Sequence, residues 1–171
     1  KPFLKSIVPL LKKDMELDVK FSFGDADPAA ELKNDRDEDK EESGMASIDL
    51  KIKGLEGIKQ VSMDTFALES KIQAITVCKD IARNMGTSFY EHVEDVAEIC
   101  LSKLMRDRIA MTVRAQSSKL MRFCVASCEE HPERQRALFI MSYMVMMEEL
   151  DFYVPKKNFE AINKVLKEIH K

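Results

Sequence analysis

The stretch TFALESKIQAITVCKDIARNM, residues 65–85, decides the fold because its apolar residues recur every three or four positions. That spacing places them on one face of an α-helix. Gly86 follows at the expected helix stop. The expected N-terminal cap is Asp64, just before the stretch, or Thr65, its first residue. The apolar stripe consists of Leu68, Ile72, Ile75, Cys78, Ala82 and Met85.

The same pattern returns about 43 residues further along the chain, where Val113-Arg114 corresponds to Ser70-Lys71. This period lies within the roughly 40–47 residues that are typical of HEAT and armadillo repeats. The sequence therefore predicts an all-α fold, an α-α superhelix of the HEAT/armadillo solenoid type, with an inserted acidic loop and a β-hairpin. The two predicted helix pairs are 65–85 with 89–105, and 109–128 with 133–150.

The repeat period divides the chain into five parts that we treat as one array. Because the chain starts at once with an apolar helical stripe, we expect a fragment from the middle of a longer array. The predicted parts are 1–13 (second helix of a truncated repeat), 14–63 (insert), 64–106 (repeat), 107–151 (repeat) and 155–171 (start of a further repeat).

The helix predicted at 133–150 is apolar on nearly every side, which is typical of a helix covered on several sides. Its methionines at 141, 144, 146 and 147 have two interpretations. Methionine suits an adaptable binding groove, but such a run is more often ordinary core. We expect core.

The insert combines strand patterns with a charged run. Val19, Phe21 and Phe23 alternate with polar residues, although the segment around them is ambiguous. Residues 46–52 and 58–61 also alternate, and the glycine-bounded turn 54–57 separates them. This arrangement predicts a β-hairpin. A lone hairpin is marginal in water, so we expect it to pack on the helices.

Composition limits the classes of function. Hydrophobic residues make up 45% of the chain and the net charge is −3, but residues 25–43 carry nine acids against three bases. An acidic insert on a nearly neutral scaffold argues against a nucleic-acid partner. No stretch approaches the roughly 18 uninterrupted apolar residues of a membrane span. All four cysteines lie on apolar helix faces, which favours reduced thiols in cytosol or nucleus.

No group of residues forms a recognisable catalytic motif. The three histidines are scattered, and 54–57 is too short and lacks the lysine of a phosphate-binding loop. Cys124, Cys128 and His131 could supply part of a zinc site, but the fourth ligand is missing and a buried helix stripe gives the same spacing. We therefore expect no enzyme activity, no cofactor and no metal.

With the repeats placed, the order of parts resembles the importin-β (karyopherin-β) family of nuclear transport receptors, and most closely its importin-5 branch. The resemblance covers most of the chain, although its individual motifs are loose. The segments that carry it are Pro2-Phe3-Leu4 with Pro9-Leu10-Leu11, the acidic run Asp35–Glu42, the extended pair Ala46–Val61, Ala67-Leu68-Glu69-Ser70-Lys71, and Phe89-Tyr90-Glu91-His92-Val93-Glu94-Asp95-Val96.

The resemblance implies a non-catalytic receptor that carries cargo on a concave helical face and releases it to Ran in its GTP state. It also implies binding to Phe-Gly nucleoporins and shuttling between cytoplasm and nucleus through the nuclear pore. The alternative is a HEAT or armadillo scaffold of another assembly, with the same fold and no Ran dependence.

Two acidic features are candidate sites for cargo with basic segments. In a HEAT pair the second helix lines the concave side, where carboxylates would attract lysine and arginine side chains. A merely solvated face is the alternative for both features. The helix candidates are Glu91, Glu94, Asp95 and Glu98, and the insert candidates are Asp35, Asp37, Glu38, Asp39, Glu41 and Glu42.

Overall fold

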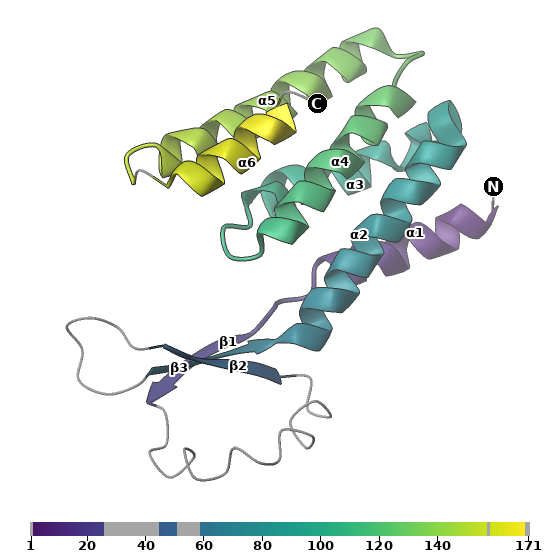
Figure 1. The fold of residues 1–171 in the computed structure, drawn as a ribbon. Helices are drawn as coiled ribbons and strands as arrows, with labels where there is room; N and C mark the ends of the chain where they lie inside the picture. The colour runs from purple at the N-terminus through teal and green to yellow at the C-terminus, as the bar shows by residue number, and fades with distance from the viewer. Residues whose placement is uncertain (1, 26–44, 51–58, 157, 170–171) are drawn as a thin grey trace. The chain divides into compact units, whose positions relative to one another are not determined.

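A computed structural model describes residues 2–25, 45–50, 59–156 and 158–169 (Figure 1). The chain divides into a helical unit, residues 1–16 and 71–171, and a sheet unit, residues 17–70. The α-helices are α1 (Pro2–Met15), α2 (Thr65–Met85), α3 (Tyr90–Ser102), α4 (Met111–Ser127), α5 (Pro132–Tyr153) and α6 (Phe159–Ile169). Short 3₁₀ turns, η4 (Gly86–Phe89) and η5 (Leu104–Arg106), flank α3.

Helix α2 begins and ends at the residues that the sequence predicted. The backbone N–H of Ala67 donates to the Asp64 side chain at 2.9 Å, which satisfies one of the open donors of the first turn. At the other end Gly86 has a φ of +54°, a left-handed conformation that glycine adopts without steric cost. The predicted cap and the predicted stop are both confirmed.

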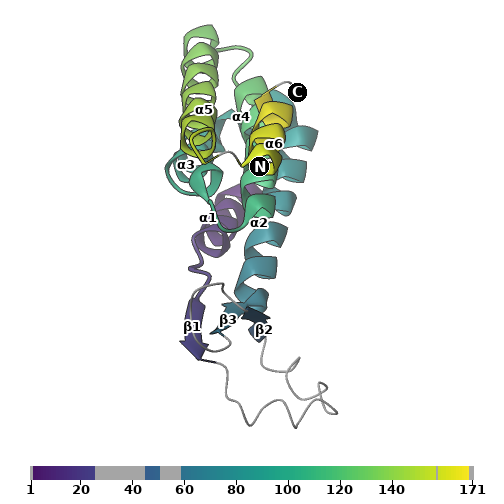
Figure 2. The same cartoon turned by 60° about the vertical axis from the view of Figure 1, so that its left-hand side comes forward.

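The core of the helical unit lies where α2, α3 and α4 bring their apolar stripes together. Phe89, at the turn before α3, is fully buried. Figures 1 and 2 show α3 and α4 running beside each other in this unit. The core residues of these elements include Ile75, Cys78 and Ala82 from α2, Val93, Val96 and Cys100 from α3, and Val113, Leu120, Met121 and Cys124 from α4.

Helices α5 and α6 close the far end of the helical unit. Leu150 and Tyr153 near the end of α5 pack on Val165 of α6. Half-buried side chains, among them Met111 of α4 and Met146 of α5, pack around that cluster. The predicted start of a helix near residue 158 is confirmed, whereas the division of the chain into repeats stays a prediction.

Helix α5 contradicts one expectation from the sequence. We expected it to be covered on several sides, but Phe139 is 61% exposed and Met144 is 55% exposed. Met141 and Met147 are exposed as well, and Met146 is half-buried. The prediction of ordinary core for these methionines is therefore wrong. Because α3, α4 and α6 contact only part of α5, a broad apolar face of this helix remains at the surface.

The sheet unit contains three antiparallel strands in the order β1-β3-β2. The strands are β1 (Phe21–Asp25), β2 (Met45–Leu50) and β3 (Lys59–Asp64). Val61 of the central strand pairs with Phe23 on one side and Ile48 on the other. The predicted pairing of the two extended runs is confirmed, and the strand-like run at 19–23 supplies a third strand. The predicted turn at 54–57 lies outside the described residues.

Candidate binding groove between α3 and α5

The carboxylates on α3 are exposed because the opposite side of this helix is buried. Val93, Val96 and Ala97 are at most 2% exposed. A helix turn of 3.6 residues then leaves the acidic positions at the surface. The acidic residues of α3 are Glu91, Glu94, Asp95 and Glu98, and all four are exposed.

These four carboxylates do not all face the same neighbour. Glu94 pairs with Arg134 of α5 at 2.9 Å. Asp95 turns the other way and pairs with Lys12 of α1 at 3.4 Å. Glu98 lies 3.9 Å from the same lysine and also lines the groove described next. The predicted stripe is thus divided between the α1 side and the α5 side of α3.

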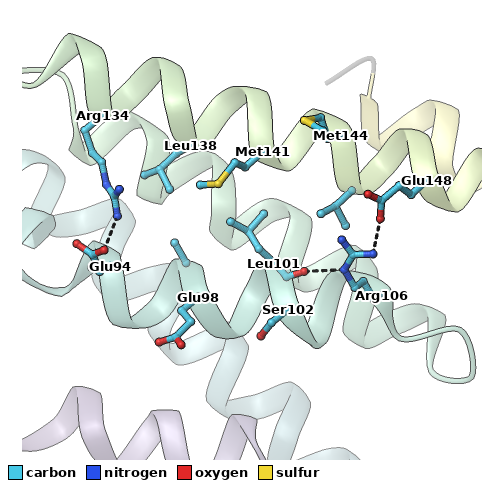
Figure 3. Close-up of a pocket in the computed structure, with 12 residues that line it drawn as sticks. Glu94, Glu98, Leu101, Ser102, Arg106, Arg134, Leu138, Met141, Met144 and Glu148 are labelled. Atoms are coloured by element: carbon cyan, nitrogen blue, oxygen red, sulfur yellow. Dashed lines mark hydrogen bonds and ion pairs between the residues drawn. The ribbon is translucent and has the colours of Figure 1, made fainter.

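A groove of about 470 Å³ runs between α3 and α5 (Figure 3). Its apolar lining comes from both helices. Leu101 of α3 faces Met141 of α5 across the groove, as the close-up shows. The other apolar residues that line it are Ala97, Leu138, Met144 and Val145.

At each end of the groove, an ion pair joins its two sides. Arg134 reaches Glu94 at one end, and Arg106 pairs with Glu148 of α5 at the other (Figure 3). Arg106 also donates from Nε to the Leu101 carbonyl oxygen at 3.0 Å, which fixes its side chain beside the apolar floor. The rim therefore carries the carboxylates of Glu94, Glu98 and Glu148 and two guanidinium groups.

The exposed carboxylates of the rim can exchange partners at little cost. The Glu94 side chain is 82% exposed and that of Glu98 is 73% exposed. Ion pairs this exposed contribute only about 0–1 kcal/mol each. A lysine or arginine of a bound segment can therefore take the place of Arg134 or Lys12, while its apolar side chains cover the methionines of the floor.

The next residue in the sequence, Glu149, lies in a different environment from Glu148. Glu149 is 1% exposed, and Arg108 donates to both of its oxygens at 3.1–3.3 Å. Buried Arg114 lies 4.0 Å from Glu149 and donates to the Tyr153 hydroxyl at 3.1 Å. This cluster ties α4 and the loop before it to α5, so its role is structural.

Sequence reasoning placed the α3 carboxylates but missed their partners across the groove. Arg134 follows Glu94 by 40 residues, and Glu148 follows Arg106 by 42 residues. Both separations are close to the repeat period. Residues one period apart occupy equivalent positions in neighbouring repeats, so the period would have predicted that these side chains meet. The candidate residues of the insert, Asp35, Asp37, Glu38, Asp39, Glu41 and Glu42, lie outside the described residues.

The thiols and histidine of the considered zinc site are not brought together. Cys124 and Cys128 are buried, and the Cys128 thiol donates to the Cys124 carbonyl oxygen at 3.4 Å. His131 is exposed and stacks on Tyr90 with ring centroids 3.9 Å apart. Burial raises the pKa of the Cys124 thiol and that of Cys78 to about 12. Thiols of this kind stay protonated and inert at neutral pH.

Among the described residues, no group of three or more His, Cys, Asp or Glu side chains is placed to hold a metal ion. In the same part of the chain, every helix is too short or too polar to cross a membrane.

Comparison with known proteins gives a match at the level of structure. No family model and no curated protein matches the sequence. Solved structures of the karyopherin Kap121p do match. Kap121p bound to RanGTP has a TM-score of 0.64 at 18% identity over 87% of this chain. Kap121p bound to the extreme C-terminus of the phosphatase Cdc14p has a TM-score of 0.68 at 15% identity over 98% of this chain.

The fold is that of a karyopherin helical solenoid. The predicted all-α fold class is therefore confirmed, with the strands as a minor part. Kap121p bound to Nup53p gives the same result, with a TM-score of 0.66 at 15% identity. The chain spans only 13–15% of the Kap121p chains that it matches. The likeness to karyopherins at this identity concerns the fold.

Proposed function

We propose that this chain is a segment of a nuclear transport receptor and that it binds protein cargo without catalysis. The α3–α5 groove carries the proposal, because it combines an apolar floor with exposed carboxylates in a karyopherin-like fold. The cargo segment is basic and extended. Its lysine or arginine side chains pair with Glu94 and Glu98, and its apolar side chains lie on Leu101 and Met141.

Several weak contacts must act together in this groove. Each exposed pair contributes about 0–1 kcal/mol, so one charge alone gives little affinity. Apolar burial adds about 25 cal/mol for each Å² removed from water. The exposed methionines of α5 supply such area beside the carboxylates. Long-range attraction between the acidic rim and a basic segment would also speed their encounter.

The proposal of a transport receptor also includes the release of cargo and passage through the nuclear pore. Kap121p has been solved in complex with RanGTP, with Nup53p and with Ste12p. We propose the corresponding partners here: cargo proteins, Ran GTPase and Phe-Gly nucleoporins. The receptor would shuttle between cytoplasm and nucleus, with this chain as one part of a longer array of HEAT repeats. The importin-5 branch remains the proposed relative within the family.

The experiment uses the longer receptor that we propose contains this chain. It is immobilised, and capture of Ran loaded with GTP is compared with capture of Ran loaded with GDP, with and without a basic cargo peptide. A strong preference for the GTP form, with displacement of the peptide, is the expected result. Equal capture of both forms would contradict a transport receptor and favour a helical scaffold of another assembly.

A further inference from the structure

A second groove, lined by basic side chains, lies between α4 and α6 and has a volume of about 320 Å³. Lys119 and Arg122 of α4 line one side, and Lys164 and Lys167 of α6 line the other. Figure 1 shows α6 lying along α5, and a contact between Lys164 and Met111 joins α6 to α4 across the groove. Among the described residues that line this groove, none carries a carboxylate.

The groove also has an apolar and small-residue component. Met111 and Ala115 of α4 line it together with Ser118. The Lys164 ammonium lies 3.7 Å from the Met111 sulfur. The Lys164 side chain therefore crosses the groove from α6 to α4. The cationic side chains surround a surface that is only partly polar.

One of the four cations has an acidic neighbour on its own helix. Lys164 donates to Glu160 at 2.8 Å, and the Glu160 side chain is 80% exposed. An exposed ion pair one helix turn apart contributes little to stability. An incoming carboxylate can therefore share or replace this contact at little cost. The other three basic side chains give the groove a strong local excess of positive charge.

We propose that the α4–α6 groove binds an acidic protein segment in which aspartate or glutamate side chains flank an apolar one. The charge of the walls selects carboxylates, and the concave shape with Met111 and Ala115 accommodates the apolar side chain. Nucleic acid would engage the cations through phosphates and would leave these apolar atoms unused. This surface is separate from the α3–α5 groove, for which we propose a basic segment as the ligand.

The test measures fluorescence anisotropy of a short labelled peptide of alternating glutamate and leucine, titrated with this chain. The matched probe replaces glutamate by lysine. Lys119→Glu with Arg122→Glu is expected to weaken binding of the acidic peptide about tenfold or more. Lys164→Gln with Lys167→Gln, on the other helix, is expected to weaken it about threefold. Binding should also weaken with added salt, which screens exposed charges beyond about 8–10 Å.

The control variant makes the same charge change outside both grooves, Arg83→Glu with Arg136→Glu, at two exposed positions. It is expected to leave affinity for the acidic peptide within about twofold of the parent chain. Circular dichroism melting checks that each variant is folded. Equal loss in the control and the groove variants would overturn the proposal, because a diffuse positive field would then suffice.

Two further probes separate the other classes of partner. A DNA duplex and vesicles that contain phosphatidylserine are titrated under the same conditions. Weak binding of both, unchanged by Lys119→Glu with Arg122→Glu, supports a protein segment as the ligand. Tighter binding of either probe than of the acidic peptide, with loss in that variant, would overturn the assignment.

Discussion

Glu148 and Glu149 are consecutive residues of α5, and each pairs with an arginine 41–42 residues earlier in the chain. The Glu148 side chain is 50% exposed at the rim of the α3–α5 groove, whereas that of Glu149 is 1% exposed. The two arginines are similarly exposed, at 40% and 44%, so the two pairs differ in the burial of the carboxylate. Burial, and not residue type, decides which carboxylate is available to a ligand.

The environment of Glu149 shows what a buried charge requires. Arg108 donates to both of its oxygens, and the same guanidinium lies 3.6 Å from the centroid of the Phe152 ring. Arg114, which is buried, lies 4.0 Å from Glu149. A charge removed from water needs such partners, because losing one leaves the other uncompensated. Glu148 is half exposed, so water can serve as its partner and it does not need a second arginine.

The largest predicted effect is on stability at Glu149. Glu149→Ala should lower the free energy of unfolding by about 3–5 kcal/mol. The reason is that Arg114 would stay buried after the carboxylate beside it had been removed. The matched change Glu148→Ala should cost about 1 kcal/mol or less. Urea denaturation of both variants, followed by circular dichroism, measures the difference. Similar losses at the two positions would contradict the contrast between buried and exposed pairs.

A second prediction extends the contrast to a buried thiol. Burial raises the pKa of Cys78 from 9.0 to about 12, so folding favours the neutral form. Above about pH 9 the unfolded chain loses this proton while the folded chain keeps it. The free energy of unfolding should therefore fall by about 1.4 kcal/mol per pH unit between about pH 9 and 12 from this group.

The variant Cys78→Ala isolates that contribution. Other groups also titrate at alkaline pH, so the informative quantity is the difference between variant and parent chain. Unfolding measured by urea at pH 8, 9 and 10 should show a shallower fall for the variant. A fall of the same steepness in both proteins would show that the thiol does not titrate as its burial predicts.

A third prediction concerns the apolar floor of the groove. Met141→Ser with Met144→Ser should weaken binding of a lysine–leucine peptide about tenfold, because leucine side chains would lose apolar area to cover. Met147→Ser is the control, since Met147 is exposed on the same helix but does not line the groove. Anisotropy titration compares the variants. Equal binding by all three proteins would show that Met141 and Met144 do not contribute to peptide binding.

Local signals in the sequence were enough to place individual helices. The apolar stripe of α2, the Asp64 cap and Gly86 act within a few residues, so they fixed both ends of that helix. The strand pairing around β3 was likewise readable from alternation and turn residues. The repeat period predicted the solenoid class because each repeat must cover the apolar face of its neighbour.

Other features depended on which surfaces meet, and composition alone does not determine that. The apolar sides of α5 looked like core, yet Phe139 and Met144 are exposed because the neighbouring helices contact only part of its circumference. Arg134 and Arg106 carried no local signal of their own. Their partners lie about one repeat away, so the period would have predicted these contacts if it had been applied to side-chain pairs.

The most direct test of the central claim is whether the α3 carboxylates hold a basic segment. The lysine–leucine peptide is titrated against the parent chain and against the variant Glu94→Gln, Asp95→Asn and Glu98→Gln. The control neutralises three exposed carboxylates elsewhere, as Glu129→Gln, Glu130→Gln and Asp151→Asn. We predict about tenfold weaker binding for the α3 variant and little change for the control. Unchanged affinity in the α3 variant would show that this face is merely solvated and would contradict the proposed cargo groove.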